Sequence, residues 1–170
     1  MFLTSNSYGA LLGTTVYQSF VAGIVSYRAL PRPQFATLQA KLTPVYFALQ
    51  TILPCFLALT YPASPRGQGS LLGVLEPQNQ IGVLVPILGM FVMGAANVVA
   101  LGPATTKVMK QRKHQETRDG KKYYDQGEHS KEMTELNRRF ARLHGLSALV
   151  NMVGMGFLVW YGAVLGERIA

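Results

Sequence analysis

Four long stretches of the chain carry no Lys, Arg, Asp or Glu, and this constrains the fold more than any other feature. They run from Tyr8 to Tyr27, Leu42 to Tyr61, Ile81 to Leu101 and Leu143 to Leu165. Each has about 20 residues, the length that a helix needs to cross ~30 Å of hydrocarbon. Because backbone amides find no water in that layer, a spanning segment has to be helical. The sequence therefore predicts an all-α integral membrane four-helix bundle, a single membrane domain over residues 1–170.

The distribution of charge predicts how the spans are oriented. Of the 16 Lys and Arg residues, 14 fall in the first and third connections, which lie on the same side of a four-span protein. By the positive-inside rule, these connections lie in the cytosol and both termini lie outside it. The net charge of +8 would suggest nucleic acid for a soluble chain. Basic loops of a membrane protein serve topology instead, so we expect the lipid bilayer and no nucleic acid as partner.

The third connection, about residues 102–142, is the longest polar segment and is predicted to form a helical cytosolic hairpin. Gly102 and Pro103 are expected to break the helix of the third span, and Pro103 suits the first turn of a new helix. Ser130 is a candidate cap for a helix that continues into the fourth span. The basic residues of this connection favour docking of anionic lipid headgroups or of a membrane-protein partner. The alternative is a solvated loop that sets topology alone.

No acidic or basic side chain lies in the middle of any span, which argues against a proton- or cation-coupled pump. The third span instead holds Asn97, and the fourth holds His144, Ser147 and Asn151 on one helical face. These groups could line a polar path or a small-molecule site. Hydrogen bonds between helices, worth ~0.6 kcal/mol per pair on average, are the favoured interpretation. We therefore expect Asn97 and Asn151 to face the bundle interior.

The sequence carries no motif for catalysis or metal binding. It lacks a Gly-rich phosphate loop, a nucleophile elbow and a His-Glu-x-x-His segment, and its three histidines lack metal-ligand spacing. We expect no enzyme activity, no cofactor and no metal site. Cys55 and the pairs Met90/Met93 and Met152/Met155 could form a path for a soft metal. Methionine is also an ordinary gap-filling residue of membrane helices, and this second interpretation is favoured.

Three segments resemble the transmembrane protein 205 family of small four-span membrane proteins. They are Phe20–Phe47, with Arg-x-Leu-Pro and Gln-x-Lys-Leu-x-Pro-x-Tyr-Phe elements, then Asn97–Met109, and then Phe140–Asn151, which reads FARLHGLSALVN. Their order agrees with the family and they touch all four spans. Gly102 departs from the family, because an acidic residue often stands before that proline. The resemblance marks these motif positions: Arg28, Pro31, Gln39, Lys41, Pro44, Asn97, Pro103, His144, Gly145, Ser147 and Asn151.

The resemblance implies an association with platinum-drug resistance and with vesicle or secretory trafficking, and it supplies no catalytic residues. We expect a non-enzymatic multi-pass membrane protein that acts in trafficking, assembly or membrane organisation. The alternative is a small transporter or efflux component for a soft-metal or drug-like solute, and a membrane-embedded enzyme comes third. The expected location is the endoplasmic reticulum or another endomembrane, with a mitochondrial membrane as the alternative.

The candidate binding site is the cytosolic rim, where the ends of the spans meet. An even number of crossings returns the ends that carry Arg28, Lys41 and His144 to the same face. We hypothesise that His144 and Ser147 hydrogen bond to the connection between Arg28 and Lys41 and form a small polar pocket beneath the hairpin. The alternative is that His144 faces lipid headgroups. The candidate binding residues are Arg28, Lys41, Asn97, His144, Ser147 and Asn151.

The charge asymmetry makes the orientation testable. Cysteines introduced near Asn6 and Ser70 should react with a membrane-impermeant thiol reagent from the lumenal side, and a cysteine near Lys121 should react from the cytosolic side. The opposite labelling pattern would overturn the predicted orientation.

Overall fold

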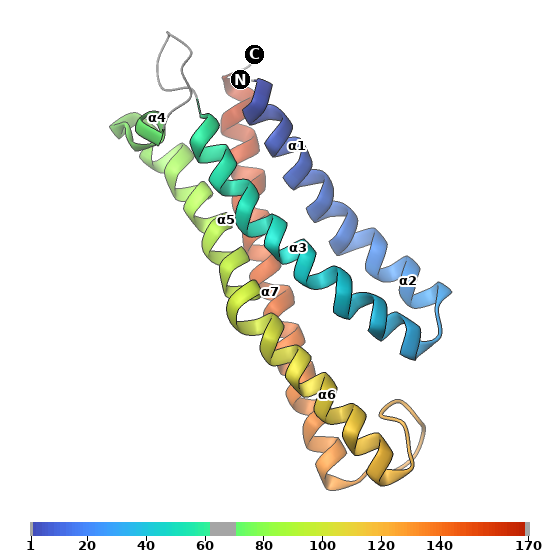
Figure 1. The fold of residues 1–170 in the computed structure, drawn as a ribbon. Helices are drawn as coiled ribbons and strands as arrows, with labels where there is room; N and C mark the ends of the chain where they lie inside the picture. Colours follow the sequence, from blue (N-terminus) through green and yellow to red (C-terminus); the bar gives the residue numbers. More distant parts are fainter. Residues whose placement is uncertain (1, 62–70, 169–170) are drawn as a thin grey trace.

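The computed structural model describes residues 2–61 and 71–168, and every regular element in this part of the chain is helical (Figure 1). The helices join end to end into four long rods. The first rod consists of α1 (Phe2–Val16), η1 (Tyr17–Ala22) and α2 (Gly23–Ala29), and the second is α3 (Arg32–Thr60). After the short α4 (Leu71–Leu75), the third rod consists of η2 (Pro77–Asn79), η3 (Gln80–Leu84), α5 (Val85–Ala95), η4 (Ala96–Leu101) and α6 (Gly102–Asp119). The fourth rod is α7 (Lys131–Glu167).

All four rods are long and apolar enough to cross a membrane, so the chain is a multi-pass membrane protein. Each rod contains one of the uncharged runs, apart from Tyr61, which follows the last residue of α3. The rods also extend beyond these runs. Much of the first connection is helical, because α3 begins at Arg32, well before Leu42. The second connection up to Ser70, with Arg66, lies outside the described residues.

The rods pack so that α3 lies between α1 and α5, while α7 packs against α5 and α6. Figure 1 shows both chain termini and α4 at one end of the bundle, and the α2–α3 connection and α6 at the other. We call these the termini end and the hairpin end. The buried apolar core lies toward the termini end and includes Leu57, Val83, Leu158 and Tyr161. Toward the hairpin end, the pair formed by α2 and α3 diverges from α6 and α7.

The second and third rods approach most closely at Gly94 of α5. A Cβ atom at this position would lie 2.8 Å from the backbone oxygen of Gln50 and 2.9 Å from the Oγ1 atom of Thr51. Both atoms belong to α3, and a backbone oxygen cannot move aside as a flexible side chain can. Glycine therefore sets the distance between α3 and α5 in the middle of the bundle.

The prediction that Gly102 and Pro103 break the third span is wrong, because the helix continues through them into α6. The preceding turn, η4, is a π-helix, and the Gly102 N–H donates to the Asn97 carbonyl five residues earlier. A Cβ atom on Gly102 would lie 2.8 Å from that same oxygen. The wider turn and the absence of a side chain at Gly102 allow the helix to continue to Pro103. Pro103 lies in the first turn of α6, where its missing N–H costs little.

At the hairpin end, α6 packs against the first turns of α7. The helix α6 ends at Asp119. The next residue is Gly120, whose φ of 62° lies in the left-handed conformation that glycine adopts most readily. The prediction that Ser130 caps the next helix is confirmed, since its Oγ accepts from the Met133 N–H at 3.1 Å. From this cap, α7 runs without interruption through the fourth span. The side of the membrane on which this hairpin lies stays a prediction.

The close approach at Gly94 predicts a large effect of side-chain volume there. The substitution Gly94→Val should lower the free energy of unfolding in detergent by about 1–3 kcal/mol, because the added atoms collide with the α3 backbone. Gly13→Val is the matched control, since nothing lies within 4 Å of a Cβ atom at Gly13. Equal thermal stability of the two variants would show that α3 and α5 do not pack as described.

Candidate functional site

A hydrogen-bond network centred on Asn151 joins three of the four rods in the middle of the bundle. The Asn151 side chain, on α7, donates from Nδ2 to the Ser19 Oγ at 2.9 Å and accepts from the Tyr46 hydroxyl at 2.7 Å. On α3, Gln50 donates to the same Tyr46 oxygen at 2.7 Å and to the Thr15 Oγ1 at 3.3 Å. We call these five residues the central network. Its members are amides and hydroxyls that hydrogen bond to one another within the membrane-spanning part of the bundle.

The third rod is attached by a separate pair of bonds one turn along α7. The Ser147 Oγ donates to the Asn97 Oδ1 at 2.7 Å, and the Asn97 Nδ2 lies 3.4 Å from the Ser147 carbonyl oxygen. Asn97 is fully buried and Asn151 is 8% exposed, which confirms that both face the bundle interior. Through Ser147 and Asn151, one face of α7 therefore bonds to residues of all three other rods.

Two of the rods contain a π-helical turn where one of their polar side chains hydrogen bonds to α7. Ser19 lies in η1 and Asn97 lies in η4. A π-turn inserts an extra residue into the helix, which rotates the following side chains and often occurs at functional sites. Here the turns bring Ser19 and Asn97 to bonding distance of Asn151 and Ser147.

A small cavity adjoins the central network. Its volume is about 10 Å³, and its lining includes Thr15, Gln50, Met90, Gly94 and Asn151. This is room for about one water molecule, and the polar lining could bind it. Met90 and Met93 of the predicted soft-metal path both line this cavity, whereas Cys55 and Met152 are exposed and do not.

The pocket predicted at the rim is not formed as hypothesised. Ser147 bonds to Asn97 on the third rod and not to the first connection. Among the described residues His144 makes no hydrogen bond, and its exposed ring stacks on Phe140 one turn away at a centroid distance of 5.8 Å. Arg28 and Lys41 are exposed as well. The His144 ring therefore packs against its own helix at Phe140 and does not bond to the connection between Arg28 and Lys41.

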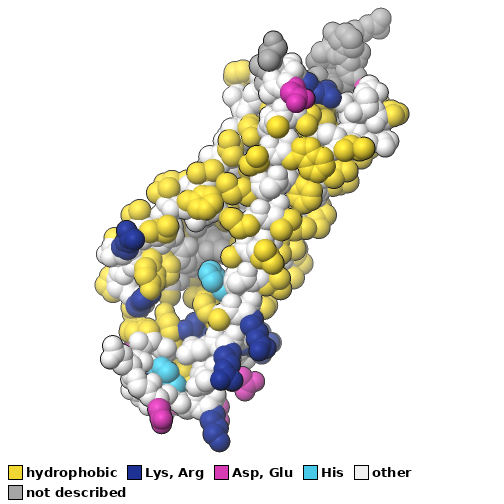
Figure 2. All heavy atoms as spheres, turned by 180° about the vertical axis from the view of Figure 1, so that it is seen from behind, with side chains coloured by type: hydrophobic (Ala, Val, Ile, Leu, Met, Phe, Trp, Pro, Cys, Tyr) yellow, Lys and Arg dark blue, Asp and Glu magenta, His cyan; other side chains and the backbone are white. Residues whose placement is uncertain are grey.

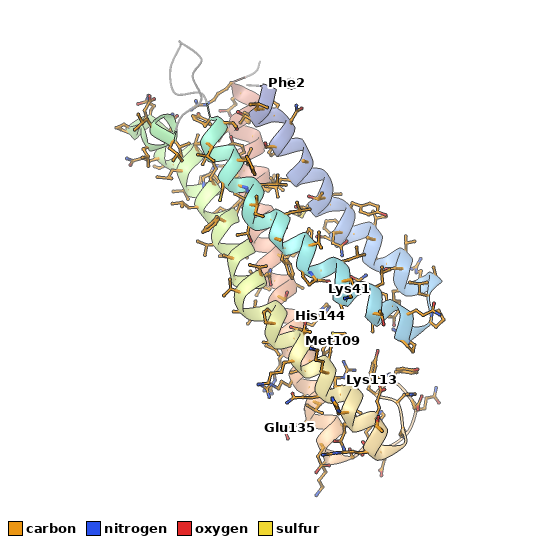
Figure 3. The ribbon with its side chains drawn as sticks, viewed as in Figure 1. Phe2, Lys41, Met109, Lys113, Glu135 and His144 are labelled. Carbon is orange, nitrogen blue, oxygen red and sulfur yellow. The ribbon has the colours of Figure 1, made fainter. Side chains whose placement is uncertain are left out.

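The six predicted binding residues thus divide into two groups. Asn97, Ser147 and Asn151 lie between helices and hold the rods together. Arg28, Lys41 and His144 lie at the hairpin end and are exposed; Figure 3 labels Lys41 and His144 there.

The hairpin contains a buried arginine that clamps its two arms. The guanidinium of Arg112, on α6, lies 3.8 Å from the ring centre of Tyr123 and 4.5 Å from that of Phe140 on α7. Arg112 lies beyond the uncharged run of the third rod. Burial lowers its pKa below the ordinary value, while Tyr123 and Glu116 favour the charged form. The Tyr123 N–H also donates to the Glu116 carboxylate at 3.3 Å, so the turn is fixed to α6.

At the termini end, the last turn of α7 is tied to the start of the third rod. Arg168 donates to the Asn79 Oδ1 at 2.6 Å, and Asn79 donates in turn to the Gly73 carbonyl at 2.6 Å. The first rod is attached at the same end, where Thr4 donates to the Thr60 carbonyl at 2.7 Å. These bonds close the bundle around its apolar core.

Four members of the central network, namely Thr15, Ser19, Tyr46 and Gln50, are not among the predicted binding residues, and Tyr46 is the hardest of them to recognise. A tyrosine within an uncharged run is taken as part of the apolar span, so the hydrogen-bonding capacity of its hydroxyl is overlooked. The signal that could have found it is the spacing of Tyr46 and Gln50, which are four residues apart and so share a helical face.

Comparison with known proteins finds a matching family model and similar curated proteins. A family model described as "Domain of unknown function (DUF4149)" matches residues 6–114, which cover most of the first rod, the whole of the second and the third rod into α6. The chain is also 30% identical over 163 residues to the "Xanthocillin biosynthesis cluster protein D" of Aspergillus fumigatus. That alignment covers 96% of this chain and 86% of the relative. No solved structure was found to match the chain.

The hydrogen bonds between the rods predict unequal costs for the replacement of Asn151 and of Asn97. Asn151→Leu should lower the free energy of unfolding in detergent by about 0.5–2 kcal/mol, because Ser19 and Tyr46 lose their partner. Asn97→Leu should cost less, since its bonds reach Ser147 alone. Ala148→Leu, at an exposed position of the same helix, is the control and should cost little. If neither asparagine variant loses thermal stability, these amides do not hold the helices together.

Proposed function

The chain belongs to the DUF4149 family, a domain of unknown function, and we propose that it is a non-enzymatic membrane protein that acts in assembly, trafficking or membrane organisation. We further propose that it works in the manner implied by its resemblance to the transmembrane protein 205 family. In this proposal the protein resides in the endoplasmic reticulum or another endomembrane, with the hairpin in the cytosol.

The closed centre of the bundle is the observation that carries this proposal. The polar side chains there hydrogen bond to one another, both between helices and within α3. The cavity beside them has a volume of about 10 Å³. Pockets for drug-sized solutes have volumes of roughly 300–1,000 Å³. Gly94 also brings α5 into contact with the α3 backbone at this level. Such a centre favours a role in holding a fixed shape over a role in passing a solute.

The hairpin is the part of this shape that is suited to a partner. Its arms are fixed to one another by Arg112, and the Ser130 hydroxyl donates to the Asp119 carboxylate at 2.7 Å. Figure 2 shows Lys and Arg side chains gathered on the hairpin, while hydrophobic side chains cover the rods above it. A rigid, charged element beyond the membrane surface supports docking of an acidic partner.

The second candidate is a small transporter or efflux component for a soft-metal or drug-like solute. The observation that favours it is the relative that is named for a biosynthesis cluster, because the product of such a cluster can require export. A four-helix monomer has little room for a path, so this candidate requires several copies to assemble around one.

Reconstitution separates the two candidates. The purified chain in liposomes should give the same efflux of Cu(I) and of a small fluorescent dye as protein-free liposomes. Proximity labelling from the 121–129 segment should enrich membrane proteins for the wild type and lose them when Arg138 and Arg139 are replaced by Gln. Both arginines are exposed on the hairpin arm of α7. Efflux that depends on the protein would overturn the assembly role. So would labelling of the same membrane proteins by the wild type and by the variant that lacks the two arginines.

A further inference from the structure

The hairpin end of the bundle contains an open cleft where α3 diverges from α6 and α7. The α3 wall is a surface hollow lined by Pro33, Gln34, Thr37, Leu38 and Lys41. Figure 2 shows the surface hollowed between this arm of the molecule and the hairpin. In Figure 3, Lys41 on α3, Met109 on α6 and His144 on α7 lie around the space between the three helices. We call this space the rim cleft.

The rim cleft lies at the depth where a membrane changes from hydrocarbon to headgroups. Lys41 directly precedes the uncharged run of the second rod, and His144 is the second residue of the uncharged run of the fourth. Apolar side chains are exposed on the membrane side of these two residues, namely Leu42, Val45, Leu146 and Leu149. On the other side of Lys41, the hollow is lined by the polar Gln34 and Thr37 together with the apolar Pro33 and Leu38. Beyond Lys41 the wall therefore adds polar groups to apolar ones, where the headgroup end of a phospholipid would lie.

The charge of the rim cleft is positive. The chain has no Asp or Glu before Glu76, so Arg28, Arg32 and Lys41 belong to a segment without a carboxylate. Lys41 is exposed at the base of the hollow, where its long side chain can extend to the headgroup layer. On the facing helix, the buried Glu116 already pairs with Lys113 at 3.5 Å. This charge favours a phosphate over a zwitterionic headgroup, whose ammonium finds no carboxylate on α3.

We propose that the rim cleft binds one anionic phospholipid, with its headgroup phosphate between Lys41 and His144. The acyl chains would then lie along the exposed apolar residues of α3 and α7, from Leu42 to Val45 and from Leu146 to Leu149. This apolar lower wall is the reason to assign a lipid and not a free phosphate ion. The site differs from the basic surface of the hairpin, and it does not depend on the proposed partner-docking role.

Lipid selectivity tests the proposal on the full-length chain. The protein is equilibrated with equal amounts of phosphatidylserine and phosphatidylcholine, and the lipids that remain bound are counted by native mass spectrometry. The wild type should retain one phosphatidylserine with a preference of about fivefold, the factor expected for one basic residue near an anionic headgroup. Lys41→Gln should remove the preference, and His144→Gln should reduce it. Lys122→Gln, at an exposed position of the hairpin turn, should leave it unchanged.

Two further measurements keep the test decisive. Thermal unfolding of each variant in phosphatidylcholine nanodiscs should match the wild type, which shows that lost selectivity is not lost folding. Replacement of Lys107 and Lys110, which are exposed on α6, should leave the preference in place. An unchanged preference in Lys41→Gln would overturn the proposal. A preference that disappears with Lys107 and Lys110 instead would place the lipid on the hairpin and overturn it as well.

Discussion

The bond system around Asn151 is the interaction on which the rest of the bundle depends. Apolar side chains alone cannot fix how membrane helices pack, because lipid tails solvate them as well as other helices do. A buried amide is different, since leaving it without a partner in hydrocarbon is costly. Asn151 finds partners on the first two rods, and Ser147 finds one on the third. These bonds specify the rotation of each rod about its axis, which the apolar runs leave open.

The backbone of two rods departs from a regular α-helix where these bonds form. Both η1 and η4 depart from α-helical geometry at the level of the polar contacts. In η4 the wider turn requires a residue without a side chain at Gly102. The geometry of η4 therefore accounts for the glycine at this position. A glycine accommodates the Asn97 carbonyl, and the helix continues past Pro103 as one rod.

The sequence predicted the rods and the inward-facing asparagines because both depend on local properties. Length without charge identifies a span, and a lone amide in such a span has to find a partner. The cap at Ser130 was predictable for the same reason, since it acts within a single turn. The pairing of His144 and Ser147 with the first connection was wrong because it depends on how far α3 diverges from α7. The distances between helices depend on contacts such as Gly94 of α5 against Gln50 of α3, which no spacing rule within one helix reveals.

The two ends of the polar face of α7 differ in a way that bears on function. Asn151 and Ser147 are saturated by neighbouring helices, and the cavity beside them holds about one water. His144 lies one turn further on, where the helices have separated and the side chain is exposed. The same helical face therefore changes from a structural seam to an accessible surface within two turns. Since the closed seam holds the rods in place, it also fixes the width of the rim cleft. A ligand at this cleft meets walls whose positions are set by the buried bonds above them.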